Sequence, residues 1–226
     1  NPEPRQLPPM PYRAIVFDLD GTLLNTLDDI ADGANAVLAE GGYPTHPVDA
    51  YRYFIGNGVA TLFERALPED DRRPSIIRAC VEGFRQVYER HWDVKTHLYD
   101  GVAELLDALV TRDVRMAVLS NKPHSFTRKS VGRYLSRWPL SPVLGQRDGI
   151  PHKPDPAGAL EIADELGVAP TEFLYLGDTA TDMETARAAG MFAVGALWGF
   201  RPEEELREAG AAALIAGPLE LLECIR

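Results

Sequence analysis

Two pairs of acidic residues stand where apolar stretches of the sequence end. The first pair is in Asp18-Leu19-Asp20-Gly21-Thr22, directly after the apolar run 14–17. A carboxylate at the end of a buried strand costs free energy unless a partner stabilises it, so this position indicates a function. Because Gly21 lets the chain turn, both carboxylates can point into one site. One can then attack phosphorus while the other moves the proton.

The second pair, Asp178 and Asp182, follows the apolar run 173–177. Carboxyl ends of parallel strands meet at one edge of a sheet, which would bring three or four carboxylates together there. Hard oxygen ligands in this number favour Mg²⁺. The alternative is that Asp178 and Asp182 only cap the next helix and supply negative charge to its first turn. Asp182 could serve both purposes.

Two further segments offer groups that bind phosphate. Ser120 and Asn121 follow the second apolar run, and a hydroxyl with backbone N–H groups at the start of a loop or helix forms a phosphate site. Lys153 is one of four lysines in the chain and stands beside Pro154, with Pro156 close by. Prolines stiffen the segment and would help a lysine direct its charge at phosphate.

The elements that must position these groups alternate along the chain. Helical patterns lie between short apolar runs, and Gly167 is a plausible C-cap for the one through Leu160, Ala163 and Leu166. This alternation predicts a doubly wound α/β fold with a parallel sheet covered on both faces. The five expected strands are 14–17, 116–119, a weaker one near 143–144, 173–176 and 193–197.

About a hundred residues separate the first two strands, far more than one crossover needs. Helical apolar stripes fill the interval, which predicts a helical cap over residues 27–98. The sheet domain would comprise residues 12–26 and 99–226, and residues 1–11, with five prolines, would be a flexible tail. An insertion at the carboxyl end of a strand covers the ligand crevice of such a fold.

Composition excludes several classes of protein. The net charge of −11 argues against nucleic acid as a partner, and no apolar run approaches the roughly 18 residues of a membrane helix. With no signal-peptide pattern, we expect a cytoplasmic protein. Cys80 and Cys224 occupy apolar helical positions and are expected to be buried thiols. The five histidines lack the pairing with cysteine that zinc sites show.

Taken together, the motifs resemble those of the haloacid dehalogenase superfamily, and the resemblance extends from Tyr12 to about Phe200. It implies that Asp18 is a nucleophile forming an aspartyl phosphate and Asp20 a general acid and base. Ser120 and Lys153 would bind phosphoryl oxygens, with Lys153 also restraining Asp18. Asp18, the backbone carbonyl of Asp20, Asp178 and, in support, Asp182 would hold Mg²⁺. Gly21, Thr22 and Asn121 are also assigned to the phosphate site.

Within the superfamily, the chain is similar to phosphoglycolate phosphatases. Gly56-Asn57-Gly58 looks like the glycine-rich cap loop that touches substrate in that group, and Trp198-Gly199-Phe200 also resembles it. The alternative is that Gly56 and Gly58 only turn the chain. Asn25 departs from the aspartate that relatives usually carry there. Asp20 disfavours dehalogenation, and a cap whose only lysine is Lys95 disfavours phosphonate cleavage.

The leading hypothesis is hydrolysis of a small phosphomonoester, with 2-phosphoglycolate as the favoured substrate. Open alternatives are a phosphosugar mutase, hydrolysis of pyrophosphate or nucleotide monophosphates and, more distantly, a non-catalytic phospho-receiver module. The partner would be a small phosphorylated metabolite, without nucleic acid or membrane. Arg52 and Arg65 are candidate contacts for a substrate carboxylate. The sequence leaves the oligomeric state open.

Overall fold

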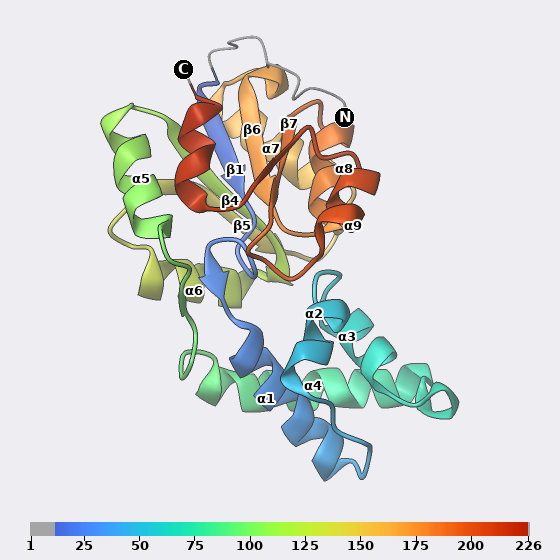
Figure 1. The fold of residues 1–226 in the computed structure, drawn as a ribbon. Helices are drawn as coiled ribbons and strands as arrows, with labels where there is room; N and C mark the ends of the chain where they lie inside the picture. Colours follow the sequence, from blue (N-terminus) through green and yellow to red (C-terminus); the bar gives the residue numbers. More distant parts are fainter. Residues whose placement is uncertain (1–11, 226) are drawn as a thin grey trace.

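A parallel sheet forms the centre of the computed structural model, which describes residues 12–225 (Figure 1). Six strands lie in the order β5-β4-β1-β6-β7-β8, with every neighbouring pair parallel. The predicted tail, residues 1–11, lies outside the described residues. Chain order reverses on either side of β1 (Ala14–Phe17), since β4 (Arg115–Pro123) lies on one side and β6 (Phe173–Gly177) on the other. Ligands bind at the carboxyl edge of such a sheet.

Both faces of the sheet are covered, and alternate residues of each strand point to opposite faces. In β1, Ile15 and Phe17 pack with α5 (Val102–Thr111), whereas Ala14 and Val16 pack with α7 (Ala157–Leu166) and α8 (Ala180–Ala188). Burial on both faces explains why these strands are continuously apolar. The predicted doubly wound α/β fold is therefore confirmed.

Two sequence expectations about this sheet were wrong in detail. A sixth strand, β8 (Ala213–Ile215), pairs with β7 at the edge of the sheet. Leu160, expected on the buried stripe of α7, is 42% exposed, and the buried face is instead formed by Gly158, Ala159, Ile162 and Ala163. Gly167 does end this helix in the left-handed conformation. The remaining elements of the sheet region are α6 (His124–Tyr134), β5 (Leu140–Gln146), β7 (Phe192–Ala196) and α9 (Glu203–Glu208).

Four α-helices within residues 27–91 pack around a separate apolar cluster, below the sheet in Figure 1. They are α1 (Leu27–Glu40), α2 (Tyr51–Phe54), α3 (Val59–Ala66) and α4 (Pro74–His91). The chain enters this region through β2 (Leu24–Asn25) and leaves through β3 (His97–Leu98), and these two short strands pair antiparallel. Within residues 12–225, no helix is both long and apolar enough to span a bilayer.

Candidate active site

Three buried carboxylates meet at the carboxyl edge of the sheet. Asp18, Asp178 and Asp182 each place an oxygen within 4.8 Å of the other two. Burial, and then the nearby charge of Asp182, raises the pKa of Asp18 to about 7, although Lys153 opposes the shift. The pKa of Asp178 is raised for the same reasons, burial first and the Asp18 charge second. Such a crowded set of hard oxygen donors fits a divalent cation, which would offset the repulsion.

The structure fixes Asp178 in place from several sides. Its carboxylate accepts hydrogen bonds from Thr22 Oγ1 at 2.9 Å and from the Phe200 backbone N–H at 2.8 Å. A Cβ added at Gly21, whose φ is +93°, or at Gly199 would collide with the Asp178 side chain. Thus Gly21, Thr22 and the segment 198–200 surround a candidate metal ligand, and Thr22 is completely buried behind it.

Lys153 joins two of the carboxylates. Its Nζ lies 2.9 Å from Asp18 Oδ1 and 2.7 Å from Asp182 Oδ1, and it also donates to the Leu119 carbonyl. The nearby carboxylates raise the pKa of this lysine well above its ordinary value, although burial opposes the shift. The other oxygen of Asp182 accepts from the backbone N–H and the hydroxyl of Thr179 at the start of α8. Asp182 therefore both supports the cluster and caps a helix.

Asp20 stands apart from the three clustered carboxylates and pairs with a lysine that sequence reasoning did not single out. Lys122 Nζ lies 2.9 and 3.2 Å from the two carboxylate oxygens of Asp20, and it donates to Tyr88 Oη at 2.9 Å. Tyr88 belongs to α4, so this buried bridge joins Asp20 to the helical region between the strands. Only the position of Lys122, two residues after Ser120, could have drawn attention to it.

The loop 56–58 rests on the sheet region through side-chain amides. Asn121 Nδ2 donates to the carbonyls of Gly56 and Lys153, while its Oδ1 accepts from the Lys153 N–H. Asn57 Nδ2 donates to Thr181 Oγ1 at 3.0 Å. Because these amides are occupied by protein groups, Asn121 and Asn57 serve here to position the loop and Lys153.

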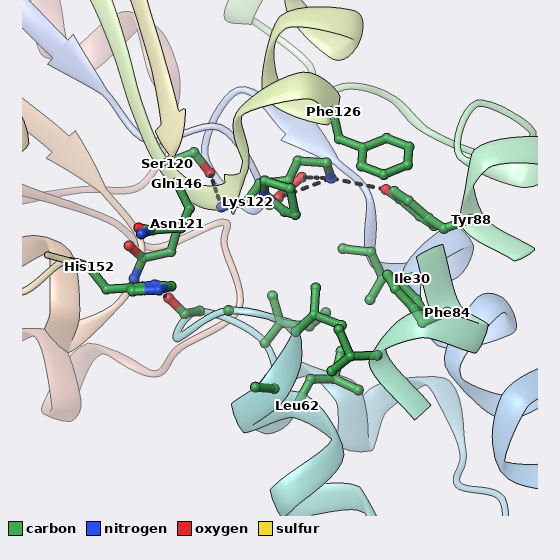
Figure 2. A pocket seen from close by; sticks show the side chains of 18 of the residues that line it. Ile30, Leu62, Phe84, Tyr88, Ser120, Asn121, Lys122, Phe126, Gln146 and His152 are labelled. Atoms are coloured by element: carbon green, nitrogen blue, oxygen red, sulfur yellow. Dashed lines mark hydrogen bonds and ion pairs between the residues drawn. The ribbon is translucent and has the colours of Figure 1, made fainter. Parts of the chain in front are cut away.

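A cavity of about 380 Å³ opens between the sheet and the helices α1, α3 and α4. Figure 2 shows Ser120 and Lys122 on one side and Ile30, Leu62 and Phe84 facing them. Asp18, Asp20, Lys153, Gly56, Gly58 and Asn121 also line it. The structure thus brings together most of the predicted site residues around one cavity, with Asp178 and Asp182 adjoining Asp18.

Two candidate contacts for a substrate carboxylate lie elsewhere, and one cysteine is less buried than expected. Arg52 and Arg65 are not among the lining residues, and their guanidinium groups donate to backbone carbonyls, of Gly199 and of Tyr53 and Phe54 respectively. Cys224 is only half-buried and follows a short 3₁₀ helix, whereas Cys80 is buried in α4 as expected. Both cysteines are free thiols.

A doubly wound sheet with clustered carboxylates, a buried lysine and a hydroxyl at its carboxyl edge is suited to binding and transferring a phosphoryl group. A family model described as haloacid dehalogenase-like hydrolase matches residues 15–196. The chain therefore belongs to the haloacid dehalogenase-like hydrolase family.

Similar proteins include two that are named phosphoglycolate phosphatase. The one from Thiobacillus denitrificans is 35% identical over 80% of this chain and 82% of its own length, and the one from Nitrosospira multiformis is 31% identical over 96% and 97%. A crystal structure from Lactobacillus delbrueckii subsp. bulgaricus, assigned provisionally as a phosphoglycolate phosphatase, superimposes with a TM-score of 0.90 at 28% identity. It covers 96% of this chain and 99% of that one.

Proposed function

We propose that this chain hydrolyses small phosphomonoesters through a phosphorylated Asp18, with Asp20 moving the proton and Mg²⁺ bound by the clustered carboxylates. The observation that carries the proposal is the separation of the acidic groups. Asp18, Asp178 and Asp182 are crowded together, while Asp20, two residues on, has its own lysine partner. Carboxylates in different environments can take different roles, and a cation bound by the cluster would favour the ionised form of Asp18 that attack on phosphorus requires.

The chain is a phosphoric monoester hydrolase, as its family and its relatives indicate. In the proposed mechanism, an Asp18 oxygen attacks phosphorus and the ester P–O bond breaks, while Asp20 gives its proton to the departing alcohol oxygen. Asp20 then takes a proton from a water molecule, which attacks the aspartyl phosphate and releases Asp18 and inorganic phosphate. Lys153 holds Asp18 in place, and Ser120 lies where it can donate to a phosphoryl oxygen.

Mg²⁺, when bound, would neutralise charge on the phosphoryl group. Asp18 and Asp178 would hold it, with the backbone carbonyl of Asp20, and Asp182 would support them through Lys153. We also propose that residues 27–98 act as a cap over this site, because their helices line the opposite side of the cavity. The cytoplasmic location remains a prediction from the sequence.

We propose 2-phosphoglycolate as a substrate, because two relatives that match most of the chain carry the name of that activity. The test is the release of inorganic phosphate from a panel of phosphoesters, with Mg²⁺ and with EDTA. We expect Mg²⁺-dependent release from 2-phosphoglycolate. Release that continues unchanged in EDTA would contradict the metal assignment, and release from hexose phosphates or nucleotides alone would contradict the substrate.

Substitution of the two aspartates tests the assigned roles. Asp18→Asn should abolish turnover without loss of fold, because an amide is a poor nucleophile. Asp20→Asn should reduce kcat by about 10²–10⁴-fold, the usual contribution of general acid–base catalysis. Turnover near the wild-type rate by Asp18→Asn, with the fold verified by circular dichroism, would exclude Asp18 as the nucleophile.

A further inference from the structure

The side of the cavity that faces away from the carboxylates is apolar. Ile30 from α1, Leu62 from α3 and Phe84 from α4 line it, and Val59 and Val81 add half-exposed aliphatic surface. The rings of Phe84 and Tyr88 stack with centroids 4.9 Å apart, and Phe126 meets Tyr88 edge to face at 5.1 Å. Figure 2 shows Ile30, Leu62 and Phe84 across the open space from Ser120, with Tyr88 and Phe126 on the side of Lys122.

The cations that line the cavity already have carboxylate partners. Lys153 pairs with Asp18 and Asp182, and Lys122 pairs with Asp20. Arg85 is the one arginine among the described lining residues, and it is largely exposed and bound to Glu82. Partial burial lowers the pKa of His152, which disfavours the charged form of that ring. A second anionic group on a substrate would thus face an apolar wall without an unpaired cation.

From this arrangement we infer a second class of substrate, phosphomonoesters of apolar alcohols whose alkyl or aryl body occupies the space between Ile30, Leu62, Phe84 and Phe126. The inference rests on the proposed phosphatase function and names the leaving group that the cavity favours. The phosphate would lie among Asp18, Ser120 and Lys153, and the alcohol oxygen would point toward Asp20. The carbon chain would then extend to the apolar wall.

The size of the cavity supports this class of leaving group. About 380 Å³ falls in the range of roughly 300–1,000 Å³ found for pockets that enclose drug-sized ligands. 2-Phosphoglycolate, with its two-carbon body, would leave much of that space to water. An alkyl chain would displace this water and bury its own apolar surface against the wall, which is favourable in proportion to the area removed from water.

The experiment compares kcat/KM for methyl, butyl and hexyl phosphate and for 2-phosphoglycolate, at saturating Mg²⁺. Burying one methylene fully is worth about fourfold in kcat/KM, and at half that factor the five extra methylenes of hexyl phosphate should raise kcat/KM about 30-fold over methyl phosphate. A flat alkyl series, with 2-phosphoglycolate as the best substrate, would overturn the inference and leave the proposed function intact. Hydrolysis of none of the esters would overturn both.

Two variants on α4 provide a matched pair. Val81→Arg places a cation on the apolar wall and should lower kcat/KM for hexyl phosphate while raising it about tenfold for 2-phosphoglycolate, as expected for one added hydrogen bond between charged groups. Ile77→Arg, one turn earlier and outside the lining, should change both values less than twofold. Val81→Ala, which retains the apolar character, should lower only the hexyl value. Equal effects of both arginine substitutions on both substrates would contradict the inference.

Discussion

Lys122 is almost completely buried, and a buried ammonium group is tolerated only where oxygen atoms surround it. Asp20 provides two such oxygens and Tyr88 a third. The nearby Asp20 and Tyr88 raise the pKa of Lys122 above its ordinary value although burial opposes this, so the lysine keeps its charge throughout the usual pH range. Asp20 is therefore held in one orientation by a permanent cation.

Tyr88→Phe tests the hydrogen bond between Lys122 Nζ and the Tyr88 hydroxyl. The variant keeps the ring stacked on Phe84 and removes the hydroxyl, so the free energy of unfolding should fall by about 1.5–3 kcal/mol, the typical effect of losing one hydrogen bond to a charged group. We expect kcat to fall as well, because Lys122 loses the contact that helps to fix Asp20. Denaturant titration and steady-state kinetics measure the two effects.

Tyr134→Phe is the matched control, because no hydrogen bond joins the Tyr134 hydroxyl to another described residue. It should leave both quantities nearly unchanged. Equal losses in the two variants would show that the Tyr88 hydroxyl has no special role.

The sequence predicted the site residues that belong to a recognised motif. Six such residues lie in or beside one cavity: Asp18, Asp20, Ser120, Lys153, Asp178 and Asp182. Lys122 was not predicted, because its significance depends on Tyr88, which is 34 positions away in helix α4. Arg52 and Arg65 were proposed from charge alone, and charge does not tell which way a side chain points.

At the level of elements, a buried carboxylate joins the beginning of the helical region to its end. Asp29 near the start of α1 is 2% exposed and accepts hydrogen bonds from the backbone N–H groups of Lys95 and Thr96 and from the Thr96 hydroxyl. These bonds attach the segment that follows α4 to the first turn of α1. The predicted boundaries of the cap meet at this contact.

Asp29→Ala should therefore lower the free energy of unfolding by about 2–4 kcal/mol, because it leaves buried N–H donors without an acceptor and removes hydrogen bonds to a charged group. Asp32→Ala is a matched control, since Asp32 also contacts Lys95 but the pair is half-exposed. That substitution should cost less than about 1 kcal/mol, as surface ion pairs usually do. Chemical denaturation of both variants measures the difference, and similar losses would contradict the assigned role of Asp29.

Element prediction succeeded where apolar runs were long or strictly periodic, as in β1, β6, α1 and α5. It missed β8, because three residues in an alanine-rich stretch at the sheet edge carry little pattern. It misplaced Leu160 because the small residues Gly158 and Ala159 form the buried face of α7, and small residues let the helix lie close to β4. A Cβ added at Gly158 would come within 2.7 Å of Leu119.

For the whole molecule, the three clustered carboxylates repel one another, and a bound cation would reduce this repulsion and so stabilise the fold. A ligand that binds only the folded state adds about 2.7 kcal/mol of stability at 100 times its Kd, which corresponds to about 5–11 °C in Tm for a protein of this size. Mg²⁺ should raise the Tm by this amount, and EDTA should reverse the rise. Scanning calorimetry at increasing Mg²⁺ measures the effect without relying on activity.

Asp178→Asn should remove most of this Mg²⁺ response, because it replaces a charged ligand by a neutral amide. Glu184→Gln on the exposed face of α8 removes one negative charge nearby and should leave the response intact. A Tm that stays independent of Mg²⁺ in the wild-type protein would contradict the proposed metal site.

The pairing of β2 with β3 constrains how the helical region can move. The two connections are paired antiparallel, with Leu24 opposite Leu98 and Asn25 opposite His97, so any bending there would have to involve both of them. A rotation about this pairing would break the contact of loop 56–58 with Asn121 and that of Tyr88 with Lys122 in the same movement. Opening of the cavity would then also release Asp20 from its alignment, and closure would restore it. Entry of the ester would thus be coupled to the alignment of the proposed proton donor.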